Sequence, residues 1–198
     1  MTSLTSTGST GALGSAAPAV GPAGRAMAQP MDPALIEALQ QHLSLERQAS
    51  ATYFALSIWF AERELRGFAG YMKQESLDEQ THAAGVADYL IARGQSVVLE
   101  QIAAPRQNWS AVEEICTAVF QMEADVTSSL QQIHAQAERC ADVRTTVFLE
   151  PLVEQQLQAE HQAAHLLGRV RFARQQPAAL LLIDGELSAG DQQPISLA

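Results

Sequence analysis

The sequence predicts an all-α fold, with four long helices in one bundle, a long crossover between the second and third helices, and a short fifth helix at the C-terminal end. Four stretches, at about 33–62, 65–94, 110–139 and 142–174, carry apolar residues at steps of three and four. Each stretch is long enough for a helix of roughly 40 Å, and helices of this length pack by default into a bundle.

The starts of the first two helices and the crossover have local signals. Asp32 supplies an N-cap residue and Pro33 the first helical position of the first helix. A short turn leads to the second helix, which ends at Gly94. The following stretch, GQSVVLEQIAAPRQNW, is apolar but lacks a helical period and contains Pro105, so we expect an extended crossover.

Three further elements complete the expected chain. Ser110 to Glu113, SAVE, has the pattern of a capping box that opens the third helix. The fourth helix begins near Asp142 and contains Pro151, where we expect a kink or a local break. A short apolar helix begins at Pro177 and ends near Gly190.

The composition indicates one folded domain between two tails. A chain of 198 residues with 47% hydrophobic content is long enough for one core and too short to need two. Residues 1–30 consist mainly of Gly, Ala, Ser, Thr and Pro, so we expect a disordered N-terminal tail. The predicted domain spans residues 31–190, and residues 191–198 form a C-terminal tail.

The charge and the apolar runs limit the classes of partner. A formal net charge of −10 argues against nucleic acid and suits cationic clients. No apolar run approaches the length of a membrane span, and no signal peptide is recognisable, so we expect a soluble cytoplasmic protein without a membrane partner. Cys116 and Cys140 form neither a CxxC pair nor a disulfide framework.

Each predicted core-facing stripe is interrupted near its middle by polar side chains. These are Glu46 in the first helix, Glu75, Glu79 and His82 in the second, Glu123 in the third, and Gln156 and Glu160 in the fourth. Any one alone would more often be a solvated rim residue, and a lone ExxH pattern is weak. Together, without Arg or Lys in the stripes, they require a cation, because buried unpaired carboxylates are costly. Oxygen-rich ligation with one imidazole suits iron or manganese better than structural zinc.

This combination resembles the non-haem bacterial ferritins, with the closest similarity to cyanobacterial ferritins. The resemblance rests on LERQASATY, DEQTH, FQMEADVTSS, EQQ and the terminal LLLIDGEL, and it covers residues 22 to about 190. It implies an iron storage protein with a ferroxidase centre that oxidises Fe(II) with dioxygen. It also implies a homo-oligomeric shell of 24 subunits, because the short fifth helix resembles the element that lines fourfold pores in full-size ferritins.

The resemblance implies a role for each matching residue. Glu46 and His82 resemble terminal ligands of the first iron, Glu79 the bridge and Glu123 the ligand of the second iron. Tyr53 would hydrogen-bond within the centre and supply an electron, although its stripe position also suits an ordinary core tyrosine. Gln156 would lie beside the second iron.

Four other acids match less closely. Glu75 and Glu160 resemble ligands of an accessory third iron position, but the family often has a glutamate three residues after the glutamine, where this chain has Ala159. Glu150 matches the lining of threefold pores and Asp78 would face the cavity, and both also read as plain solvated acids.

The histidines outside the ExxH pattern carry no role over from the family. His42 lies one turn before Glu46 and reads more readily as a buried seam histidine than as an outer partner of the centre. His134, His161 and His165 match no position of the resemblance.

Three alternatives remain open from the sequence. A bacterioferritin would carry a second ExxH on the fourth helix, where this chain has Gln158 and His161. A di-iron peroxidase of the rubrerythrin kind would store no mineral and would typically show a second ExxH and more glutamates. A metal-free helical scaffold would leave the seam acids unexplained.

Overall fold

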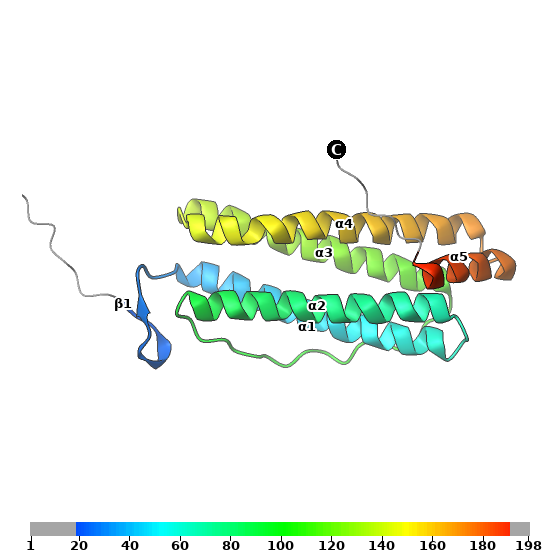
Figure 1. The fold of residues 1–198 in the computed structure, drawn as a ribbon, viewed down its shortest axis with the longest axis horizontal. Coiled ribbons are helices and arrows are strands. Elements are labelled where there is room, and N and C mark those ends of the chain that lie inside the picture. The colour runs from blue at the N-terminus through cyan, green and yellow to red at the C-terminus, as the bar shows by residue number, and fades with distance from the viewer. Residues whose placement is uncertain (1–18, 191–198) are drawn as a thin grey trace, which may run out of the picture.

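The structure is a computed structural model that describes residues 19–190, and it confirms the all-α bundle (Figure 1). The helices are α1 (Pro33–Ala61), α2 (Arg66–Ala92), α3 (Val112–Arg139), α4 (Val143–Ala173) and α5 (Pro177–Ala189). Before them, β1 (Ala19–Val20) pairs antiparallel with β2 (Ala26–Met27) around the 3-10 turn η1 (Pro22–Gly24), with Ala19 opposite Met27.

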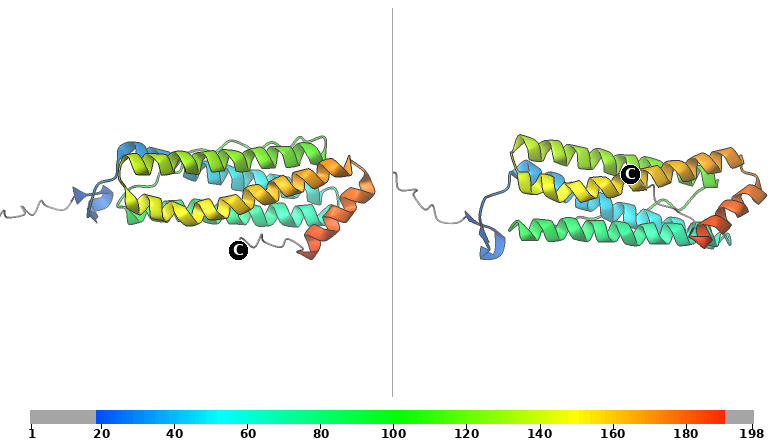
Figure 2. Two further views of the ribbon diagram at one scale, coloured as in Figure 1. Left: turned by 90° about the horizontal axis from the view of Figure 1, so that it is seen from above. Right: turned by 45° about the horizontal axis from the view of Figure 1, so that its top comes forward.

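The four long helices form two antiparallel hairpins that pack against each other. One hairpin is α1 with α2 and the other is α3 with α4, and the crossover between α2 and α3 runs along the length of the bundle (Figures 1 and 2). This crossover returns the chain to the end where α2 began, so α2 and α3 run in the same direction. Each long helix therefore brings its middle to the same height.

Side-chain caps are present at the starts of α1 and α4, where Asp32 and Asp142 accept backbone N–H groups. The carboxylate of Asp32 accepts the N–H groups of Ala34 at 2.9 Å and Leu35 at 3.3 Å, as the sequence predicts. The start of α3 differs from the expected capping box, because Ala111 and not Ser110 is the N-cap residue. The hydroxyl and the backbone N–H of Ser110 both donate to Glu114, one residue beyond the expected partner.

The helix α4 runs through Pro151 without the expected local break. Pro151 lies on the exposed side of the helix. The carbonyl of Val147, which loses its N–H partner there, lies on an exposed residue and can bind water instead.

The segment before α1 differs from the tail predicted for residues 1–30. Its described part, residues 19–30, contains the β1–β2 hairpin, which packs on the C-terminal end of α2. Arg25 donates to the carbonyl of Ile91 at 2.9 Å, and the sulfur of Met27 accepts from Gln95 at 3.4 Å. These contacts join the segment to the C-terminal end of α2 and the residues that follow it. Residues 1–18 and 191–198, the remaining predicted tails, lie outside the described residues.

Two apolar clusters make up the described core, one towards each end of the bundle. One contains Leu56, Phe60 and Phe68, with the two phenyl rings stacked at 4.8 Å. The other contains Leu39 and Leu90. The polar residues of the stripes lie between the clusters, which exclude water from above and below. The residues at steps of three and four along α1 and α3 are buried, but Val153, which continues this spacing from Leu149 on α4 and is therefore expected in the core, is 43% exposed.

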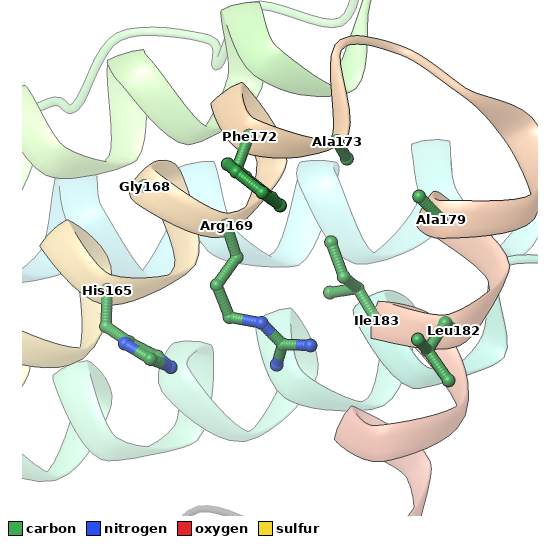
Figure 3. Close-up of a pocket in the computed structure, with 8 residues that line it drawn as sticks. All are labelled: His165, Gly168, Arg169, Phe172, Ala173, Ala179, Leu182 and Ile183. Atoms are coloured by element: carbon green, nitrogen blue, oxygen red, sulfur yellow. The ribbon is translucent and has the colours of Figure 1, made fainter.

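The last helix, α5, crosses the N-terminal end of α2. The carboxylate of Asp184 accepts the backbone N–H of Phe68 at 2.9 Å, so α5 caps a helix that has no side-chain cap of its own. Beside this contact, α4 and α5 diverge around an apolar groove of about 450 Å³ whose walls include Phe172 and Ile183 (Figure 3). Within residues 19–190, none of the helices has the length and apolar character of a membrane span.

Candidate metal centre

Three predicted site residues meet at mid-height between α1 and α2. Glu46 comes from α1, and Glu79 and His82 come from α2, and one ligand atom of each lies within 4.8 Å of the others. The spacing of three residues puts Glu79 and His82 on one helix face, where the Nδ1 atom of His82 lies 2.9 Å from a carboxylate oxygen of Glu79. The side chains of Glu46 and Glu79 are almost fully buried.

His42 contacts one carboxylate oxygen of Glu46, and the other oxygen faces Glu79. The Nε2 atom of His42 lies 3.0 Å from Oε1 of Glu46, and its Nδ1 atom lies 3.0 Å from the hydroxyl of Ser129 on α3. His42 is therefore both a buried seam residue and the outer partner of the site. The Oε2 atom of Glu46 is buried and has no hydrogen-bond donor among the described residues unless Glu79 carries a proton. Such an oxygen atom is well suited to coordinate a metal ion.

Glu46 and Glu79 are close together and buried, so ionisation of one disfavours ionisation of the other. Burial, together with the negative charge of Glu46, raises the pKa of Glu79 far above its usual range. Burial opposes ionisation of Glu46 as well, but the hydrogen bond and positive charge of His42 hold the pKa of Glu46 below its usual value. We therefore expect the pair to share a proton until a cation displaces it.

Glu123 extends the centre towards α3 and α4. The hydroxyl of Tyr53 donates a hydrogen bond to one of its carboxylate oxygens, and Nε2 of Gln156 donates to the other at 2.9 Å. Burial raises the pKa of Glu123 despite these two hydrogen bonds. Burial, with the nearby charge of Glu123, also raises the pKa of Tyr53 well above its usual value. Tyr53 is thus a neutral donor within the centre.

Glu75 of α2 lies near both Glu123 and Tyr71. Burial, followed by the charge of Glu123, raises the pKa of Glu75 to about 7. The hydroxyl of Tyr71 favours the charged form of Glu75 and partly offsets this shift, and burial raises the pKa of Tyr71 well above its usual value. Sequence reasoning missed Tyr71, although it precedes Glu75 by one helical turn on the same face. The spacing of four residues is the signal that would have found it.

The other predicted acids lie apart from this centre. Glu160 accepts a hydrogen bond from the hydroxyl of Thr127 at 2.9 Å, and Asp78, on the exposed face of α2, accepts one from Gln74 at 2.9 Å. Glu150 is exposed on α4. Among residues 19–190, the one group of three or more acidic, histidine or cysteine ligands is Glu46, Glu79 and His82.

Comparison with known proteins identifies the family of this chain. The family model for the ferritin-like domain matches residues 36–173. The chain belongs to the ferritin family. A bacterial non-heme ferritin of Bacteroides fragilis is 29% identical over 77% of this chain and 95% of its own length. A bacterial non-heme ferritin of Escherichia coli is 25% identical over 82% of this chain and 99% of its own length.

Solved structures give the same result. An open pore ferritin from the archaeon Archaeoglobus fulgidus has a TM-score of 0.78 and 26% identity, over 81% of this ferritin and 98% of the archaeal chain. A PmFTN variant soaked in iron has a TM-score of 0.75 and 28% identity, over 78% of this ferritin and 98% of that chain. These relatives confirm a non-haem bacterial ferritin and support iron storage as its general function. The closer similarity to cyanobacterial members stays a prediction.

The raised pKa values predict that the metal-free ferritin loses stability as the pH rises. The pKa of Glu75 is about 7 in the folded protein, against an ordinary value of 4.5, so protonation of Glu75 stabilises the fold in full below pH 4.5. This contribution is lost as the pH rises through about 7. We expect the melting temperature of chelator-treated protein to fall across this range, and to fall less with Zn²⁺ added. Calorimetry would measure both, and a metal-free melting temperature that rises over the range would contradict the proposed protonation.

Proposed function

We propose that this ferritin binds two Fe(II) ions per subunit at a centre formed by Glu46, Glu79, His82 and Glu123, oxidises them with dioxygen, and stores the ferric product inside a shell of 24 subunits. The observation that carries the proposal is the convergence of Glu46, Glu79 and His82, in which a buried oxygen of Glu46 has no possible hydrogen-bond donor among the described residues except a protonated Glu79. Two buried carboxylates that can be satisfied only by sharing a proton provide a favourable site for a cation.

Each side chain has a distinct task in this proposal. Glu46 and His82 bind the first Fe(II), and Glu79 shares its two oxygens between the ions. Glu123 binds the second Fe(II), while Gln156 and Tyr53 fix its orientation through their hydrogen bonds. The His42–Ser129 pair orients Glu46 in the same way.

The redox step balances with two irons and one dioxygen. Each Fe(II) gives up one electron, and two electrons with two protons convert dioxygen to hydrogen peroxide. Hard carboxylate oxygens favour Fe(III) over Fe(II), so the ligand set drives the oxidation. Binding of Fe(II) displaces the proton shared by Glu46 and Glu79, which leaves both carboxylates charged for the ferric product.

The remaining acids would serve iron traffic around the centre. Glu75 and Glu160 would hold iron in transit at an accessory position, with Asp78 on the cavity side and Glu150 at a pore. A bacterioferritin-like or rubrerythrin-like oxidase without storage is the alternative, and α4 does not favour it. This helix presents Gln156 to the centre, while His161 is exposed.

Anaerobic titration with Fe(II), followed by exposure to oxygen, tests the proposal. We expect two Fe(II) bound per subunit, rapid oxidation of both, and a particle of about half a megadalton on gel filtration. A monomer or dimer would refute the storage shell, and binding of a single Fe(II) would refute the paired centre. Crystals soaked anaerobically in Fe(II) and read for anomalous peaks would locate the ions.

Replacing Tyr53 with phenylalanine should separate its redox role from its packing role. The substitution removes one hydroxyl and its hydrogen bond to Glu123, and keeps the buried ring. We expect normal assembly and a normal first oxidation, but altered later turnovers, because Tyr53 would no longer supply an electron. Multiple-turnover stopped-flow traces would measure the effect, and traces identical to those of the parent would make Tyr53 a packing residue.

A further inference from the structure

Two histidines on the outer face of α4 are not used by the proposed centre. His161 and His165 are both exposed and lie four residues apart in HQAAH. Their rings are nearly parallel, at an interplanar angle of 19°, with centroids 6.3 Å apart. This spacing places two imidazoles on one helix face, as in helical motifs in which two histidines share one metal ion.

These rings differ from the other three histidines in having no partner. His42 contacts Glu46 and Ser129, His82 contacts Glu79, and His134 lies 3.7 Å from Glu138. Neither ring of the HQAAH pair makes a hydrogen bond or an ion pair within residues 19–190. Their nitrogen atoms are therefore free to bind a ligand from solution.

The surroundings of the pair permit a cation. Residues 157–168 contain no Lys or Arg, and the protein carries a formal net charge of −10. The nearest basic group along the helix, Arg169, is one turn beyond His165 and is paired with Glu186 of α5. Figure 3 shows His165 beside Arg169 at the edge of the groove, with the histidine ring extending away from α4.

We propose that His161 and His165 form a second metal site, separate from the buried centre, for a borderline divalent cation such as Cu²⁺ or Zn²⁺. Small rotations of the two exposed side chains bring a nitrogen of each ring to about 2.0–2.1 Å from one ion, and water completes the coordination. Imidazole ligands select copper, nickel and zinc over the hard cations magnesium and calcium, and copper should bind most tightly.

This site differs from the buried centre in its ligand chemistry. The centre offers three carboxylates and one imidazole, which suit iron, whereas the outer pair offers two imidazoles and no carboxylate. The protein would then hold Cu²⁺ or Zn²⁺ at its surface while the buried carboxylates serve Fe(II). The proposal does not depend on the function of the buried centre.

Cu²⁺ titration of the full-length protein, followed by electron paramagnetic resonance, tests the site. We compare the parent with His161→Gln, His165→Gln and the double variant, and use His134→Gln as a matched control for a single, partly exposed histidine. Beyond any Cu²⁺ bound in the buried centre, the parent should show one further Cu²⁺ per subunit with two nitrogen ligands, which the double variant lacks. Each single variant should bind this ion about a hundredfold more weakly, because one of two linked donors is lost. The control should match the parent.

A second readout separates this site from the buried centre. Both positions are exposed, so the variants should retain the circular dichroism spectrum, the particle size and the Fe(II) oxidation rate of the parent. A double variant that keeps the parental Cu²⁺ stoichiometry and two-nitrogen spectrum would overturn the proposal. So would a His134→Gln variant that loses the same signal.

Discussion

Replacing Glu79 with alanine should slow Fe(II) oxidation by about a hundredfold or more while the subunit remains folded. Glu79 is the side chain that contacts both other members of the ligand cluster, and as the proposed bridge its loss disconnects the two irons. On electrostatic grounds, metal-free Glu79→Ala should be at least as stable as the metal-free parent at neutral pH. At neutral pH the buried Glu79 either carries a charge without full solvation or holds a proton that it would release in the unfolded chain, and both states cost free energy.

Stopped-flow absorbance of the ferric product would measure the rate, and gel filtration would confirm assembly. Glu154→Ala is a matched control, because Glu154 is an exposed acid of the same bundle outside the ligand cluster. If the Glu79→Ala variant oxidises Fe(II) at the parental rate, the centre lies elsewhere. Anaerobic Fe(II) titration of the variant should in addition show fewer bound ions per subunit.

Replacing Gly67 with alanine should destabilise the protein by about 3 kcal/mol and loosen α5. A Cβ atom at Gly67 would lie 1.8 Å from the backbone carbonyl oxygen of Asp184, so the two helices cannot keep their present distance. Their separation would also break the hydrogen bond from the N–H of Phe68 to Asp184, which caps α2. The effect combines overpacking with the loss of a cap.

A matched variant on the same helix controls for helix propensity. Gly70→Ala meets no atom within 4 Å and should stabilise α2 by about 1 kcal/mol, because alanine favours helix more than glycine does. We expect the melting temperature of Gly67→Ala to fall by roughly 6–12 °C. Limited proteolysis between α4 and α5 should also accelerate. Equal melting temperatures and proteolysis rates for Gly67→Ala and Gly70→Ala would show that the close approach at Gly67 does not fix the position of α5.

The fold and the ligand cluster were largely predictable because both depend on local helical periodicity. Steps of three and four placed Glu46 and Glu123 on core-facing stripes, and both are buried. The prediction was wrong where the local pattern was ambiguous. Val153 has the stripe spacing but is exposed at the margin of the apolar face, and Glu114 takes the capping role expected of Glu113, because α3 begins one residue later.

By itself, the sequence determined the four long helices and the short fifth, together with the inward faces of the long helices and the acids on those faces, since a helix repeats every 3.6 residues whatever its neighbours are. Only the tertiary structure decided which side chains meet across helices. Ser129 reaches His42 from α3, Tyr53 reaches Glu123 from α1, and Asp184 caps a helix that begins more than a hundred residues earlier. Such contacts depend on the relative height and rotation of packed helices. The whole core sets that alignment, and no local stretch of sequence contains it.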